Sequence, residues 1–220
     1  MENPYQPPAS SVEVPALPVG ELKNPRKLAL WAVWLYGIGT VGQLGEHLWR
    51  TLAPLRPAAP LESSPVFPPY EHDTYQIGIG PFDLLMIVSG LGAVIAYLMW
   101  KYRAATNARI LDPSAMKISP TMAVGSYFIP IVFFVVPYRA MAGISRATLG
   151  NSAGVGWWWG CHVGLMIFGF VFGWHAASTG AAARPDPFTH LSMLGSVITC
   201  LISIWLVMRI TRAQAARCSP

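Results

Sequence analysis

The sequence predicts an all-α integral membrane protein with four transmembrane helices and one further helical element broken by proline. Of its 220 residues, 53% are hydrophobic and only 11% are charged, whereas about a quarter of an average soluble domain is charged. In addition, four apolar runs are each long enough to cross about 30 Å of hydrocarbon as a helix. These observations predict a single membrane domain.

The chain begins with a proline-rich segment, residues 1–27, which has five prolines in its first twenty residues. It lacks the charged start and apolar core of a cleavable signal peptide, and its composition is typical of an extended, disordered tail. The membrane domain follows over residues 28–212, and residues 213–220 form a second short tail. Both tails are expected in the cytoplasm.

The four predicted spans cover approximately residues 28–49, 81–100, 155–177 and 189–208. Tryptophans lie near the ends of all four runs, as the aromatic belts at membrane surfaces require. A proline-rich outer loop, residues 51–80, joins the first two spans. Glycines recur every four residues at Gly156, Gly160 and Gly164, a spacing expected to let helices pack closely in lipid.

The run from residue 121 to residue 141 differs from the spans because it is short and contains Pro130 and Pro137. Proline removes a helix hydrogen bond, so a break near Pro130 is expected. If this run does not cross the bilayer, twelve of the fifteen lysines and arginines lie on one side, and if it crosses, only eight do. Cytoplasmic loops are enriched in these residues. We therefore expect a re-entrant or interfacial element, buried in the bundle because irregular backbone at that depth needs protein around it.

Several residues of the second half form a recognisable set. They are Tyr102, Arg103, Ala104 and Asn107 after the second span, then Tyr127, Phe128, Pro130 and Pro137, then Arg146, and finally Trp157 and Trp158. This combination, from about Trp100 to Gln214, resembles the DUF4328 family of bacterial membrane proteins. The chain departs from the family at Phe133 and Phe134, where an asparagine-leucine pair is common. The resemblance implies a bacterial inner (cytoplasmic) membrane protein and supplies no reaction.

A basic and amide face is expected on the cytoplasmic side. Arg103 and Asn107 are four residues apart and so share one side of a helix, and the arginine fork matches phosphate geometry. The candidate binding residues are Arg103, Asn107, Tyr127, Pro130, Pro137, Arg139 and Arg146. The expected ligands are anionic lipid headgroups or an anionic solute. The alternative interpretation is that these residues only flank spans and cap helices.

Histidines on the opposite side suggest a metal site. His47, His175 and His190 all fall near the outer ends of predicted spans, and imidazole is a usual ligand for zinc, iron or copper. None of them shows close ligand spacing, and ordinary interfacial histidines are the alternative. A haem held by two histidines would need His175 with a partner from another helix. The sequence identifies no cofactor.

Three classes of function remain open. The first is a non-enzymatic scaffold, sensor or accessory component that contacts lipid, a protein partner or a second copy of the chain. The second is a small transporter or channel lined by the proline-broken element, and the third is a metal or haem redox protein. No catalytic motif appears. Nucleic acid is not an expected partner, because the basic residues flank apolar runs rather than form a binding element.

Overall fold

The fold is built from helices, and in the computed structural model residues 21–52, 81–179 and 187–218 are described. Four helices are long: α1 (Arg26–Leu52), α2 (Pro81–Leu111), α6 (Val155–Thr179) and α7 (Pro187–Ala215). Between α2 and α6 lie α3 (Pro120–Gly125), the 3-10 helix η2 (Ser126–Phe128), α4 (Pro130–Phe133) and α5 (Val136–Leu149). The described residues contain no strand, and the predicted all-α class is confirmed. Most of the predicted outer loop and residues 1–20 of the predicted tail lie outside the described residues.

The four long helices are apolar enough to cross a membrane over Arg26–Leu48, Asp83–Leu111, Val155–His175 and His190–Ala215. Many of their large apolar side chains point outward, among them Trp31, Trp34, Phe170 and Trp174. In water such a surface would be an aggregation hazard. On a membrane protein it is the face that contacts lipid, so the exposed surface supports the predicted four-helix membrane architecture.

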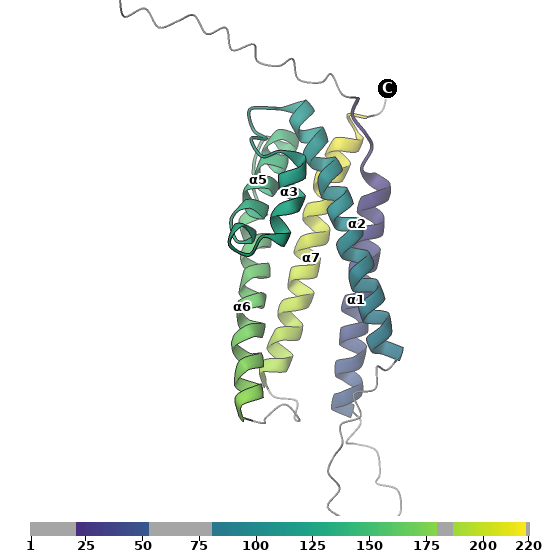
Figure 1. The fold of residues 1–220 in the computed structure, drawn as a ribbon. Coiled ribbons are helices and arrows are strands. Elements are labelled where there is room, and N and C mark those ends of the chain that lie inside the picture. The colour runs from purple at the N-terminus through teal and green to yellow at the C-terminus, as the bar shows by residue number, and fades with distance from the viewer. Residues whose placement is uncertain (1–20, 53–80, 180–186, 219–220) are drawn as a thin grey trace, which may run out of the picture.

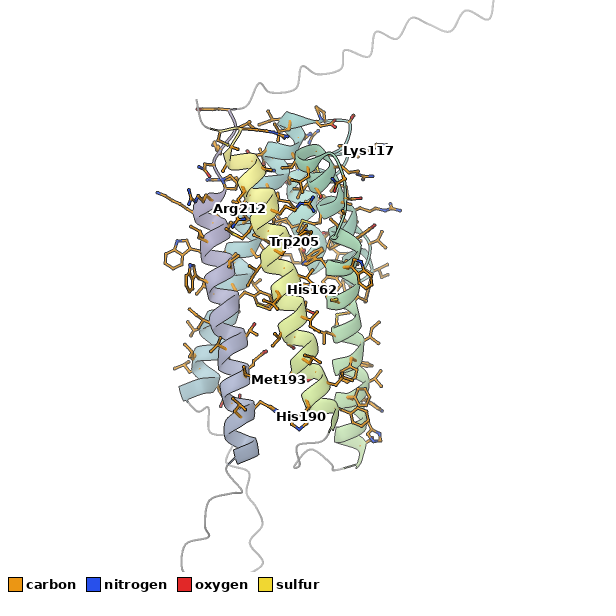
Figure 2. All side chains as sticks on the ribbon, turned by 180° about the vertical axis from the view of Figure 1, so that it is seen from behind. Lys117, His162, His190, Met193, Trp205 and Arg212 are labelled. Carbon is orange, nitrogen blue, oxygen red and sulfur yellow. The ribbon has the colours of Figure 1, made fainter. Side chains whose placement is uncertain are left out.

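The bundle has two chemically different ends (Figures 1 and 2). At one end α1 begins and α2 and α7 end, and α3 and α5 lie beside them (Figure 1). We call this the basic end, because Lys117 and Arg212 lie there (Figure 2). At the other end α7 begins, with His190 in its first turn, and we call it the histidine end.

The proline-broken element leaves the basic end and returns to it (Figure 1). The chain enters alongside the bundle through α3, turns at η2 and α4, and comes back through α5, so it adds no fifth pass to the bundle. Pro120, Pro130 and Pro137 each lie in the first turn of their helices, where a missing N–H costs nothing. Pro130 therefore starts a helix rather than interrupting one.

The proline-broken element is only partly buried, whereas the sequence analysis expected it to be buried in the bundle. Ser126 and Pro137 are buried, but Phe128 is 74% exposed and Ile131 is 86% exposed. The reason is that the turn projects from the side of the bundle and carries apolar side chains on its outer surface. Such side chains fit hydrocarbon, so lipid can take the place that protein was expected to occupy.

The buried core is concentrated toward the basic end. Trp100 and Ala104 of α2 pack there with Met141 of α5 and with Leu206 and Ile210 of α7. Small residues allow this close packing, since a backbone without a bulky side chain can approach its neighbour. The helices thus meet most closely where the proline-broken element joins them.

The glycines are used unequally. A Cβ on Gly42 would lie 3.3 Å from Met86 Cγ, so α1 approaches α2 closely there. By contrast, Gly156, Gly160 and Gly164 of α6 have no atom within 4 Å of such a Cβ. The glycine ridge of α6 therefore packs against no described part of the chain, contrary to the expectation of close packing within the bundle.

Candidate functional site

Lys101 is a lysine with no exposed surface. It lies on α2, and its Nζ donates hydrogen bonds to Tyr127 Oη at 2.7 Å and to the Pro137 carbonyl at 3.3 Å. Both acceptors are neutral oxygens rather than carboxylates. A buried charged group without a counter-charge is costly in a membrane protein and is a functional-site candidate by default.

Aromatic rings surround the same amine. Lys101 Nζ lies 4.4 Å from the ring centroid of Tyr127, 5.8 Å from that of Trp158 and 5.9 Å from that of Tyr97. The hydroxyls of Tyr97 and Tyr127 are 3.2 Å apart. Ring faces attract cations through their quadrupoles. We call Lys101, Tyr97, Tyr127, Trp158 and the Pro137 carbonyl the lysine cage.

Four elements meet at the lysine cage. Tyr97 and Lys101 are one helical turn apart on α2 and so point the same way. Tyr127 comes from η2, Pro137 from the first turn of α5, and Trp158 from the first turn of α6. The lysine cage therefore anchors the proline-broken element against α2. The hydroxyl of neighbouring Ser126 is buried and has no hydrogen-bond partner within the described structure.

A second polar cluster, the amide network, lies nearer the basic end. Asn107 Nδ2 donates to the Lys23 carbonyl at 2.8 Å and to Gln214 Oε1 at 3.1 Å, and Asn107 Oδ1 accepts from Lys23 N–H at 3.1 Å. Gln214 Nε2 donates to the Ala104 carbonyl at 3.1 Å and to Thr148 Oγ1 at 3.0 Å. These bonds join α2, α5, α7 and the segment before α1. Because the amides are buried and bonded, their role is to hold the helices together.

The structure distributes the predicted binding residues over three places. Tyr127 and Pro137 belong to the lysine cage, and Asn107 belongs to the amide network. Arg103 Nη1 donates to the Asn24 carbonyl at 3.5 Å, and Asn24 is the residue after Lys23, to which Asn107 is bonded. The remaining three, Pro130, Arg139 and Arg146, are exposed.

A groove of about 600 Å³ runs along α7 near the basic end. Its lining residues are Ile204, Trp205, Met208, Arg209, Arg212 and Ala213. The Arg209 guanidinium lies 5.1 Å from the Trp205 ring centroid, which holds it by a cation–π contact. Figure 2 shows Arg212 nearer the basic end than Trp205. The groove thus combines two arginines with an apolar floor.

Two of the three predicted metal-ligating histidines meet at the histidine end. His47 Nε2 of α1 and His190 Nδ1 of α7 are 2.9 Å apart, and the rings lie edge to face at 84°. His175, near the end of α6, is exposed. Within the described residues, no group of three His, Cys, Asp or Glu side chains is arranged to hold a metal ion. His162, deeper in α6, donates from Nδ1 to the Trp158 carbonyl at 2.8 Å.

Sequence reasoning did not single out Lys101, Gln214 or the α7 groove. Lys101 directly follows an apolar run and was counted with the basic residues that flank spans. Gln214 lies in what looks like a polar tail. One usable signal was the spacing of Trp205, Arg209 and Arg212, which places all three near one face of a helix.

Comparisons with known proteins identify one family. Residues 76–212 match the family described as Domain of unknown function (DUF4328). This match includes the lysine cage, the amide residues Asn107 and Thr148, and the lining of the α7 groove except Ala213. No curated protein and no solved structure matches the chain.

Proposed function

The chain belongs to the DUF4328 family, and we propose that it is a multi-pass protein of the bacterial inner membrane that binds anionic phospholipid headgroups at its basic end. In this proposal it works as a scaffold, sensor or accessory component rather than as an enzyme. The observation that carries the proposal is the α7 groove, with two arginines beside a tryptophan at one end of a membrane-spanning helix.

The basic end faces the cytoplasm in this proposal. Twelve of the fifteen lysines and arginines fall on that side when the proline-broken element does not cross the membrane. The element leaves and re-enters the bundle at the same end (Figure 1), which supports the assumption that it does not cross. Retained loops carry the excess of positive charge. The anionic cytoplasmic leaflet attracts basic residues near its surface.

The α7 groove suits a phospholipid better than a free anion. Arg209 and Arg212 are three residues apart on one helix, so both guanidinium groups can approach one phosphate. Ile204 and Met208 provide apolar surface in the same groove, which a soluble anion would not use. Tryptophan favours the headgroup level of a bilayer, and Trp205 also restricts the position of Arg209.

Lipid selectivity of the purified protein tests the proposal. Wild-type protein in mixed detergent micelles should retain phosphatidylglycerol in preference to phosphatidylcholine, as measured by native mass spectrometry. The double variant R209Q/R212Q should lose most of that preference, roughly ten- to thirtyfold, since each basic residue contributes about 1 kcal/mol near an anionic surface. The control K117Q removes an exposed charge at the same end and should keep the preference.

Two outcomes would overturn the proposal. The first is wild-type protein that retains both lipids equally. The second is an equal loss of preference in K117Q and in the double variant, which would mean that only net charge matters. A protein that copurifies in place of lipid, and is lost in the double variant, would indicate that the groove is a protein contact instead.

A second candidate function, a small-anion transporter, is favoured by the lysine cage. Lys101 and the unpaired Ser126 hydroxyl are buried beside the proline-broken element, and irregular backbone lining a site is typical of transporters. Proteoliposomes loaded with chloride or phosphate would then show flux that K101M abolishes and R209Q/R212Q does not. Absence of flux with both anions would count against this function and leave the lipid proposal intact.

A further inference from the structure

The histidine end carries a site that the proposed function does not use. We propose that His47 and His190 together bind one divalent transition-metal ion, of which Cu²⁺ and Zn²⁺ are the probes that suit them. The two rings come from α1 and α7, which are 143 residues apart in the chain, and their nitrogens lie 2.9 Å from each other.

The distance between the two nitrogens is close to that of a bis-imidazole metal site. With metal–nitrogen bonds of about 2.0–2.1 Å, two nitrogens lie about 2.9 Å apart at neighbouring corners of a square-planar copper site and about 3.3 Å apart in a tetrahedral zinc site. The rings meet edge to face, with centroids 4.7 Å apart. Rotation of the two side chains would turn both lone pairs toward one ion.

The surroundings allow an ion to enter. His190 is exposed and His47 is partly buried, so an ion can reach the pair from the side of His190. Two imidazoles leave further coordination positions of such an ion open to water. We therefore expect affinity on the order of micromolar rather than that of a structural zinc site.

The ion would join two parts of the fold. Both imidazoles must be neutral at the ligating nitrogen, and the hydrogen bond between them already requires one nitrogen without a proton. Replacing that hydrogen bond by two metal–nitrogen bonds would tie the end of α1 to the start of α7. This inference does not depend on lipid binding, which takes place at the opposite end of the bundle.

Metal titration of the full chain, carrying an affinity tag without histidine, tests the site. Isothermal titration with Cu²⁺ and with Zn²⁺ should show saturable binding, and H47A and H190A should each weaken it about tenfold or more. The control H175A removes an exposed histidine from α6 and should bind like wild type. The Cu²⁺ electron paramagnetic resonance spectrum of wild type should show coupling to two nitrogens, and that of H190A to one.

Several results would overturn the inference. They are no binding of either ion, equal binding by wild type and both alanine variants, or loss of binding in H175A. If H47A or H190A unfolds, H47Q provides the test, because glutamine retains hydrogen-bonding groups but is a poor ligand for these metals. Added Zn²⁺ should then raise the melting temperature of wild type and leave that of H47Q unchanged, as expected for a ligand that binds only the intact site.

Discussion

The lysine cage predicts an unusual ranking of mutational effects. Replacing Lys101 with methionine removes the amine and keeps an unbranched apolar chain, whereas replacing Tyr127 with phenylalanine removes only a hydroxyl. We expect Y127F to destabilise the protein more than K101M does. The reason is that Y127F leaves the buried amine with the Pro137 carbonyl as its one remaining oxygen acceptor.

The magnitudes follow from the contacts that the amine makes in its protonated form. Its two hydrogen bonds contribute about 1.5–3 kcal/mol each, and the closest ring, 4.4 Å away, adds about 2 kcal/mol when desolvated. Burying the charge costs several kcal/mol, so the gains and the cost nearly cancel. K101M should therefore change the free energy of unfolding by less than about 2 kcal/mol in either direction. Y127F should cost about 2–3 kcal/mol, the value of its charge-assisted bond.

A double-mutant cycle measures the coupling. Unfolding free energies of wild type, K101M, Y127F and K101M/Y127F would be measured by denaturant titration in mixed micelles, with Y138F as a control for loss of an exposed tyrosine hydroxyl. Once Lys101 is methionine, Y127F should cost less than about 1 kcal/mol, because only the bond to Tyr97 remains to be lost. An equal cost of Y127F in both backgrounds would refute the assigned role of the cage, and so would a K101M variant that fails to fold.

Two further predictions concern the basic end. Q214A removes three buried hydrogen bonds of the amide network and should lower the unfolding free energy, measured by denaturant titration, by about 2–4 kcal/mol. The control Q43A, at an exposed position, should lower it by less than about 0.5 kcal/mol. Asp112 accepts hydrogen bonds from the Ser114 hydroxyl and from the backbone N–H groups of Ala115 and Ser114, which hold the pKa of the Asp112 carboxyl below its usual value. The stability that these hydrogen bonds contribute is therefore complete above about pH 4 and is lost as the pH falls through the lowered pKa. D112N should lose less stability than wild type between pH 5 and pH 2, measured as a shallower slope of melting temperature against pH. A slope equal to that of wild type would contradict this.

The amide network also changes how a binding experiment should be designed. From the sequence alone, Asn107 and Arg103 looked equivalent as members of one ligand-binding face. The structure buries Asn107 in three hydrogen bonds to Lys23 and Gln214, so N107A would disturb folding and ligand binding together. Arg103 makes one long bond to a carbonyl, and R103A is the variant that reports on binding with less effect on stability.

The four long helices were predictable because an apolar run of about 20 residues is a sufficient signal for a span. The positions at which the helices end beyond their apolar runs were less predictable. The second span was predicted to end at Trp100, and although Arg103 and Asn107 were placed on a helix beyond it, the end of that helix at Leu111 was not predicted; α7 likewise continues past the predicted end of its span to Ala215. Hydropathy falls at the first charge, whereas lysine, arginine and alanine are good helix formers. These additional turns carry Lys101, Asn107 and Gln214, the residues on which both polar clusters depend.

Side-chain environments depended on contacts that sequence spacing does not contain. Lys101 follows a tryptophan at the end of an apolar run, which is also the usual pattern of a charge exposed at the membrane surface. Its burial results from η2 and α5 folding back over α2. Similarly, His47 and His190 have no ligand spacing in the chain, and they meet because α1 and α7 pack against each other.

Polar contacts also explain how the two halves of the bundle stay together. In lipid the hydrophobic effect does not drive one helix against another, so packing and hydrogen bonds must do so. The α1–α2 pair and the α6–α7 pair are joined near the basic end by the amide network and by the bond from Trp100 Nε1 to Thr211 Oγ1 at 2.9 Å, and at the other end by the histidine pair. The proline-broken element adds contacts at the basic end and not at the histidine end. A ligand that acts on this protein therefore has two places to change its shape: the lysine cage, where the broken element is held, and the histidine pair, where a hydrogen bond between side chains links α1 to α7.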